Sequence, residues 1–199
     1  MVVADVARGD SKDYSAFHVI DIETVTQVAE FHDQLSTKDY GNLLVNIATE
    51  YNDALLVVEN ANIGWAVLQV IIDREYKNLY YSPKSDINIV DSYSNKFGNT
   101  NNLVPGFTTS LRTRPLIITK FEAYARERSC IIQSKRLLSE LKTFIYKNGR
   151  PDALNGYNDD LIMAFAIGLY VRDTALRLQQ HGVDLTRASL EGITRKTND

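Results

Sequence analysis

The sequence predicts an α/β fold in a single domain, on the evidence of its composition and the order of its hydrophobic patterns. Its 199 residues are 44% hydrophobic and 24% charged, ordinary proportions for a globular chain that can fill one core. Short β-branched runs dominate the first part of the chain, and helical periodicities dominate the rest. We expect one domain over residues 1–180 and a polar C-terminal tail over residues 181–199.

The first sixty residues are expected to supply most of the sheet. Residues 2–6 and 15–22 predict a hairpin, and residues 24–31 predict a third strand. A helix is expected over residues 40–51, where apolar side chains recur at helical spacing. Residues 54–59 then form a compact apolar run of the kind found in buried strands, so the expected order is three strands, a helix and a fourth strand.

The remaining chain is expected to be mainly helical, with one long interruption. The periodicities predict a brief strand over residues 78–81 and helices over residues 62–74, 116–126, 134–144 and 159 to about 178. Residues 83–106 are rich in Ser, Asn, Asp and Gly and show no sustained period. Because this stretch exceeds the usual length of a connection, we expect a functional or mobile loop there.

Several classes of protein are disfavoured by what the sequence lacks. The longest apolar run, residues 161–171, is about half the length of a membrane span, so no membrane partner is expected. The single cysteine, Cys130, cannot form an internal disulfide, which fits a reducing compartment. The sequence contains no phosphate-binding loop of the form Gly-x-x-x-x-Gly-Lys-Ser/Thr, so any nucleotide-driven motor must lie outside it.

Charge is distributed unevenly along the chain. Residues 1–59 hold eleven acidic and three basic side chains, a local net charge of −8, whereas residues 108–150 hold ten basic and three acidic ones, a net of +7. A basic segment can follow a phosphate backbone, although charged helix faces are more often simply solvated. The candidate DNA contacts in this segment are Lys120, Arg126, Lys135, Arg136 and Lys142.

Carboxylates occur at three places where apolar segments begin or end. Asp5 interrupts the first apolar strand, Glu59 closes the fourth, and Asp159 with Asp160 stands directly before the last apolar helix. Each has a structural explanation, as a solvated strand end or as a helix N-cap. Together, two strand ends and one helix N-terminus can converge on one point and hold two divalent ions.

Such a site is typical of phosphodiester hydrolysis. In that chemistry one ion activates a water molecule and the other stabilises the departing oxygen. An all-oxygen ligand set favours Mg²⁺ or Mn²⁺ over zinc. The three histidines, His18, His32 and His181, have no metal-ligand spacing, so we expect them to be structural or exposed. Asp13 and Asn60 can support the ligands, or they can equally cap the elements that follow them.

Three segments, taken in order, resemble the nuclease domain of large terminase subunits of tailed bacteriophages. They are ADVARGDSKDYS at residues 4–15, VVENANIG at 57–64 and GYNDDLIMA at 156–164, and the resemblance covers nearly the whole chain. It implies a ribonuclease-H-like mixed β-sheet with helices on both faces. It also implies a two-metal endodeoxyribonuclease that cuts concatemeric double-stranded DNA during packaging.

The resemblance also assigns roles to residues. Asp5 matches the first-strand metal ligand and Glu59 the second, while Asp160 and Asp159 match the acidic pair at the last helix. Asp5, Glu59 and Asp160 are the expected catalytic residues, and Asp159 is a further ligand. Asn158 stands where the family more commonly has His, and it is expected to support the site from behind the ligands.

Family context implies partners that this chain does not contain. The N-terminal packaging ATPase domain is absent, and the short lead-in before Asp5 suggests excision from a longer polypeptide. The expected partners are that ATPase domain, the portal and the small terminase subunit. The expected location is the host cytoplasm, transiently at the procapsid portal and not in the mature virion.

Two alternatives remain open on the sequence alone. Another ribonuclease-H-like nuclease, such as a junction resolvase or an integrase core, would use a similar acidic site. A module that docks on DNA or on a portal without cutting would need the fold but not the carboxylates.

Overall fold

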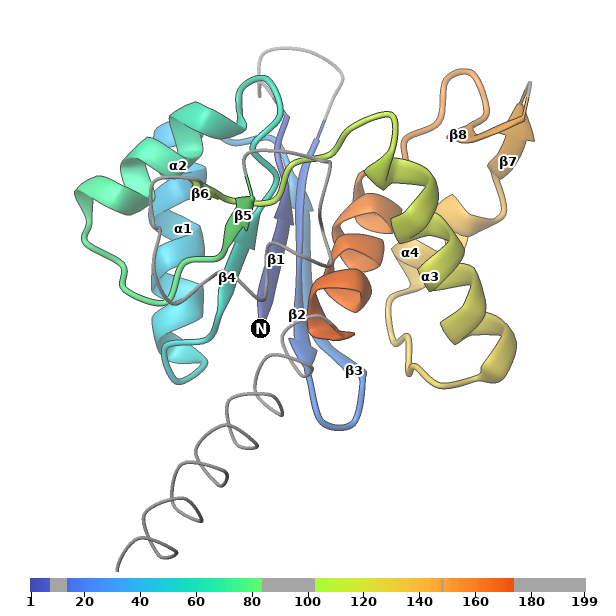
Figure 1. Cartoon of the computed structure of the whole chain (residues 1–199), viewed down its shortest axis with the longest axis horizontal. Helices are drawn as coiled ribbons and strands as arrows, with labels where there is room; N and C mark the ends of the chain where they lie inside the picture. Colours follow the sequence, from blue (N-terminus) through green and yellow to red (C-terminus); the bar gives the residue numbers. More distant parts are fainter. Residues whose placement is uncertain (8–13, 84–102, 148, 174–199) are drawn as a thin grey trace, which may run out of the picture.

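A mixed four-stranded sheet, with strand order β3-β2-β1-β4, forms the centre of the computed structural model (Figure 1). The structure describes residues 1–7, 14–83, 103–147 and 149–173. The first three strands are antiparallel neighbours, and β4 joins β1 in parallel. Their bounds are β1 Val2–Asp5, β2 Ser15–Asp21, β3 Thr26–Asp33 and β4 Leu56–Val58.

Helices cover both faces of this sheet (Figure 1). On one face lie α1 (Thr37–Glu50) and α2 (Gly64–Asp73), which bury Leu44, Leu68 and their neighbours against β1 and β4. On the other lie α3 (Thr113–Glu127), α4 (Lys135–Leu141) and the C-terminal helix, described over residues 160–173. The apolar side chains of the sheet and of these helices form two separate hydrophobic clusters, one on each face of the sheet. The predicted α/β class, with helices on both faces, is therefore confirmed.

The alternation of side chains along β1 and β4 determines the face of the sheet on which the acidic residues lie. Val3 and Val57 pack in the cluster that contains the C-terminal helix, whereas Val2 and Val58 pack against α1 and α2. Because successive strand residues point to opposite faces, Asp5 and Glu59 extend the Val3 and Val57 series. The face carrying the C-terminal helix therefore also carries both carboxylates at its end.

Three predicted elements differ from the observed ones. The helix expected over residues 134–144 ends at Leu141, and the chain instead forms the hairpin β7 (Phe144–Lys147) and β8 (Arg150–Ala153). Gly149, with φ of +76°, supplies the left-handed residue that this tight turn requires. Periodicity missed the hairpin because its strands are short and largely exposed.

The strand expected over residues 78–81 is also shifted. The observed strand is β5 (Tyr81–Pro83), which shares only Tyr81 with the expected range and pairs with β6 (Leu103–Pro105), near the end of the predicted loop. Most of that loop, together with Asp13 and the predicted tail, lies outside the described residues. The helix expected from residue 116 begins instead at Thr113 and places Pro115 in its first turn, where a missing N–H leaves no hydrogen bond unmade.

A buried histidine joins the sheet to the C-terminal helix. His18 Nε2 lies 3.0 Å from the carbonyl oxygen of Leu161, and Gln27 Nε2 lies 2.8 Å from His18 Nδ1. These contacts assign the neutral tautomer in which Nε2 donates and Nδ1 accepts. Gln27 Oε1 accepts the backbone N–H groups of Gln133 and Ser134, so the same network also fixes the entry to α4. It therefore holds the start of the C-terminal helix against the sheet.

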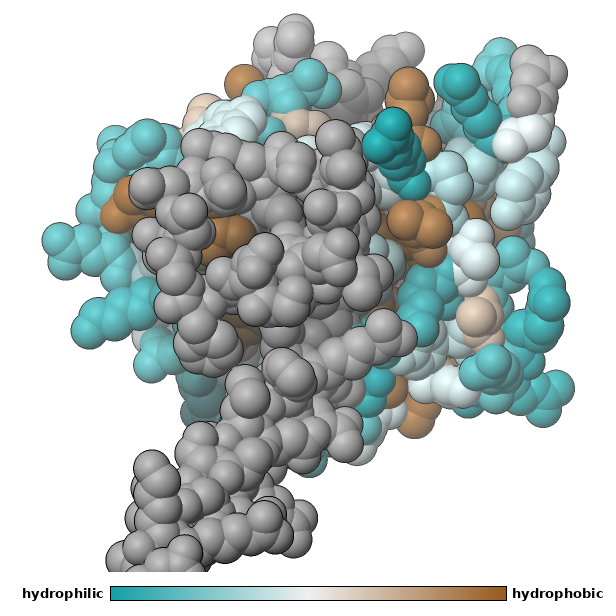
Figure 2. All heavy atoms as spheres, viewed as in Figure 1, coloured by the Kyte–Doolittle hydropathy of each residue, from teal (hydrophilic) through white to brown (hydrophobic). Residues whose placement is uncertain are grey.

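Among the described residues, no helix combines the length and the apolar character needed to cross a bilayer. In the view of Figure 2, hydrophilic side chains cover much of the described surface, and apolar ones appear as small separate areas.

Burial of His18 leads to a prediction about its protonation. Desolvation lowers the pKa of His18 to about 4, outweighing the opposite effect of its hydrogen bond to Leu161. A histidine with a folded-state pKa below its ordinary 6.5 stabilises the fold above pH 6.5, and this contribution is lost as the pH falls towards 4. In an NMR titration we expect the His18 ring resonances to show a midpoint near 4, whereas a midpoint near 6.5 would contradict the buried network.

Candidate metal centre

Asp5 and Glu59 lie side by side at the carboxyl ends of two neighbouring parallel strands. Ala4 pairs with Val58, and the backbone N–H of Glu59 donates to the Ala4 carbonyl oxygen at 2.9 Å. Gly64 permits the close packing behind this strand end, because a Cβ atom at that position would lie 2.0 Å from the Glu59 carbonyl oxygen. The turn into α2 therefore fixes the backbone that carries Glu59.

The C-terminal helix brings Asp159 and Asp160 to the same end of the sheet. In the lateral register Asp5 stands opposite Ala16, and Ala16 stands opposite His32, so these three residues share one face. His32 Nε2 lies 3.5 Å from Asp160 Oδ2. Asp160 thus reaches the row of sheet residues to which Asp5 belongs.

The electrostatics show that the four carboxylates share one neighbourhood. The pKa of Asp5 is raised well above its ordinary value, first by burial and then by Glu59, through both its charge and a side-chain hydrogen bond. Asp160 and Asp159 raise the pKa of Asp5 further. Three segments that are distant in sequence therefore place negative charge around one buried carboxyl group.

The carboxylates have different neighbouring groups. Glu59 is the nearest acidic neighbour of Asp5, and its charge and its side-chain hydrogen bond both raise the pKa of Asp5. Asp159 forms an ion pair with Arg114. Burial raises the pKa of Asp159, and the Arg114 charge opposes that shift. Asp160 faces His32, and its Oδ2 atom is buried without a hydrogen-bond partner.

The side chains do not form a completed coordination sphere. Across the described residues, no group of three or more His, Cys, Asp or Glu side chains is arranged so that it could hold a metal ion. The donor chemistry nevertheless suits a hard divalent cation, because Asp5, Glu59 and Asp160 offer only carboxylate oxygens. The unpartnered Oδ2 of Asp160 supplies a donor that no protein group satisfies.

Two residues at the site were not selected by the sequence analysis. Glu140 of α4 accepts the backbone N–H of Ile162 at 3.1 Å, and its other oxygen lies 3.8 Å from His32 Nε2. Burial raises the pKa of Glu140 to about 7, and Asp160 contributes to that shift. His32, expected to be structural or exposed, stands between Glu140 and Asp160, and its ring stacks on Tyr14 at 4.7 Å. Neither residue occurs in a recognisable motif, so only the long-range packing shows its place.

The residues expected to support the ligands have distinct surroundings. The Asn60 side-chain amide donates at 3.0 Å to the Pro105 carbonyl oxygen and to Thr108 Oγ1, so it fastens the segment after β6 to the end of β4. Asn158 lines a groove beside His32 and Glu140. Asp13 lies outside the described residues.

The structure also separates the five basic candidates. Lys120 forms an ion pair with Asp173, Arg126 with Glu122 and Arg136 with Glu30. Lys135 and Lys142 are exposed and form no ion pair within the described part of the chain. Only Lys135 and Arg136 line the groove beside Asp160. The basic segment is therefore not one continuous cationic surface.

The fold is ribonuclease-H-like, as comparison with solved structures shows. No protein-family model matches the sequence. The large terminase nuclease of thermophilic phage G20c, solved with bound magnesium, superposes with a TM-score of 0.63 at 17% sequence identity. That match covers 85% of this chain and 79% of the phage protein.

A second phage protein gives the same result. The large terminase nuclease domain of Thermus phage P74-26 has a TM-score of 0.56 at 18% identity, over 83% of this chain and 75% of its own. The resemblance to terminase nuclease domains, inferred from three sequence segments, is thus confirmed at the level of the fold.

The contact between Glu140 and Ile162 can be tested with paired variants. Glu140→Gln keeps an oxygen that can accept the Ile162 N–H, whereas Glu140→Ala removes the acceptor, and both remove the charge. We expect the Gln variant to exceed the Ala variant by about 1 kcal/mol in unfolding free energy, measured by urea denaturation. The same pair of substitutions at the exposed Glu127 should differ by less. Equal unfolding free energies of the two Glu140 variants would show that the hydrogen bond from the Ile162 N–H to Glu140 does not stabilise the start of the C-terminal helix.

Proposed function

We propose that this chain is the nuclease domain of a phage DNA-packaging terminase, and that it cuts concatemeric double-stranded DNA with the help of two divalent metal ions. One observation carries the proposal: Asp5, Glu59 and Asp160 come from distant segments to the same end of a ribonuclease-H-like sheet, where Glu59 and Asp160 both raise the pKa of Asp5. Structural proteins have little reason to bury mutually repelling acids in this way.

The residues divide into ligands and supporting groups. Asp5, Glu59 and Asp160 would hold the ions, Mg²⁺ or Mn²⁺, and Asp159 would either join them or remain paired with Arg114. Bound ions would supply activation of water and stabilisation of the negative charge that develops at the scissile phosphate. Glu140 and His18 contribute by fixing the first turn of the helix that carries Asp160.

Solved relatives in fold support a metal requirement. The G20c terminase nuclease has been solved with bound magnesium, with bound cobalt and with bound zinc. In the present chain, bound cations would offset the negative charge that Glu59, Asp160 and Asp159 place around Asp5. Carboxylates that repel one another without metal would then act together as ligands.

A wider setting follows from the same proposal. Residues 1–180 would form the nuclease domain and act beside a packaging ATPase domain, with the portal and the small terminase subunit as further partners. That setting places the protein in the host cytoplasm and transiently at the procapsid portal. A junction resolvase would instead prefer branched DNA over linear duplex.

The proposal is tested by cleavage of supercoiled plasmid in Mg²⁺, in Mn²⁺ and in EDTA. Wild-type protein should cut in either metal and not in EDTA. Asp160→Asn should lower the rate by at least about 100-fold, because it removes a carboxylate from a site that stabilises developing charge. A matched control is Asp73→Asn, at the exposed end of α2 on the opposite face, which should keep the wild-type rate.

The controls also separate the proposal from a module that docks without cutting. Such a module would show no metal-dependent cleavage in any sample. Retention of full cleavage by a correctly folded Asp160→Asn protein would overturn the assignment of the site.

A further inference from the structure

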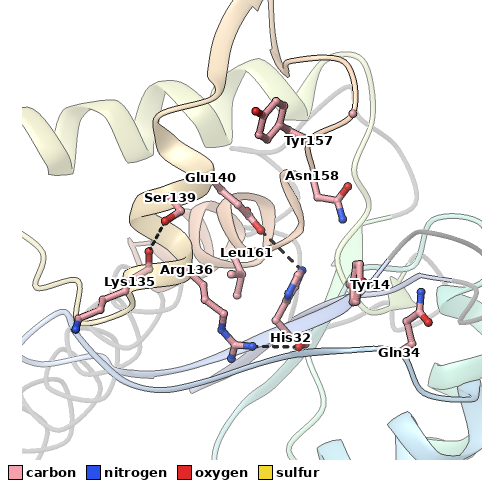
Figure 3. A pocket seen from close by; sticks show the side chains of 11 residues that line it. Tyr14, His32, Gln34, Lys135, Arg136, Ser139, Glu140, Tyr157, Asn158 and Leu161 are labelled. Atoms are coloured by element: carbon pink, nitrogen blue, oxygen red, sulfur yellow. Dashed lines mark hydrogen bonds and ion pairs between the residues drawn. The ribbon is translucent and has the colours of Figure 1, made fainter.

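An open groove of about 880 Å³ lies beside Asp160, between the end of β3, α4 and the segment before the C-terminal helix. Figure 3 shows Lys135, Arg136 and Ser139 along one wall, Tyr157 and Asn158 on another, and His32 in the middle. Asp160 approaches it through the 3.5 Å contact of its Oδ2 atom with His32 Nε2. The groove therefore lies next to the candidate metal centre, with the His32 ring between the groove and Asp160.

The charges around this groove are arranged asymmetrically. Glu140, whose side chain is 12% exposed, lines the groove, and Asp160 lies behind His32. Its outer side carries Lys135, which is exposed and has no ion-pair partner among the described residues, and Arg136. Arg136 uses Nε to bind Glu30 at 2.9 Å, and its side chain remains half exposed. Two exposed cations and one largely buried carboxylate therefore line the same groove.

We propose that this groove receives the DNA strand that adjoins the scissile phosphate, with Lys135 and Arg136 contacting its backbone. The inference rests on the proposed nuclease function and assigns the substrate path within it. A polyanion whose scissile phosphate lies at the carboxylates would place its neighbouring phosphates beside these two cations.

Charge complementarity favours this occupant over an acidic or apolar peptide. An acidic peptide would bring carboxylates towards Glu140 and Asp160 without any feature that requires that location. An apolar segment would cover the polar side chains of Ser139 and Asn158 and the ammonium group of Lys135. The exposed ring of Tyr157 forms a further wall against which sugars or bases can pack.

The test measures binding of the full chain to a fluorescent DNA duplex by anisotropy, in EDTA and over a series of salt concentrations. Each phosphate contact contributes about 0.9 to the slope of log K against log salt. Lys135→Gln should therefore reduce the magnitude of that slope by about 0.9, and Lys135→Arg should restore it. The matched control Lys38→Gln, at an exposed position of α1 on the opposite face, should leave the slope unchanged.

A second variant tests the groove without removing a cation. Ser139→Glu places a carboxylate on the exposed groove wall and should weaken DNA binding several-fold at low salt, as like charges repel. An unchanged slope in Lys135→Gln, or unchanged affinity in Ser139→Glu, would overturn the groove as the DNA path. The absence of any DNA binding by the wild-type chain would overturn it as well.

Failure of this inference and failure of the nuclease proposal give different results. If the wild type cleaves plasmid and the salt slope of Lys135→Gln is unchanged, the nuclease proposal is supported and the groove is not the DNA path. If the salt slope is reduced in Lys135→Gln but the wild type shows no metal-dependent cleavage, the groove binds DNA and the nuclease proposal is wrong.

Discussion

Mutual repulsion of buried carboxylates is the constraint on which the rest of this structure depends. Burial and the neighbouring Glu59 raise the pKa of Asp5, and the Asp159-Asp160 pair adds to the effect. Holding these groups together requires a rigid frame, because flexible segments would move the charges apart. The parallel pairing of β1 with β4 and the docking of the C-terminal helix provide that frame. Around this frame, Arg114 forms an ion pair with Asp159, and His32 faces Asp160.

The same frame explains why the polar groups of the core stand where they do. His18 and Gln27 tie β2 and β3 to the C-terminal helix and to the entry of α4. Glu140 then extends from α4 to the first turn of that helix. The sheet, α4 and the C-terminal helix therefore fix Asp160 from several directions, and the groove that they leave open is lined by α4 cations. The candidate metal centre and the proposed DNA path therefore depend on the same packing of the sheet, α4 and the C-terminal helix.

Local patterns in the sequence were sufficient for the sheet and for the acidic residues. Strands β1 to β4 alternate or run apolar, and a carboxylate that ends such a strand stands out against its neighbours. The β7–β8 hairpin and the pairing of β5 with β6 could not be predicted, because short exposed strands carry little pattern and β6 comes from beyond residue 102. His32 and Glu140 gain their roles only from contacts over long sequence distances. The ion pairs of Lys120 and Arg126 with Asp173 and Glu122 likewise depend on the folded structure, and the charge count of the basic segment did not indicate them.

The most direct test of the carboxylate constraint compares the unfolding free energies of wild type and Asp5→Asn in EDTA and in Mn²⁺. Because Asn carries no charge, the variant should be the more stable protein in EDTA, by about 1 kcal/mol or more. Mn²⁺ should stabilise the wild type and have much less effect on the variant, since the ion binds the folded carboxylates. A variant that is less stable in EDTA, or a wild type indifferent to Mn²⁺, would contradict the account.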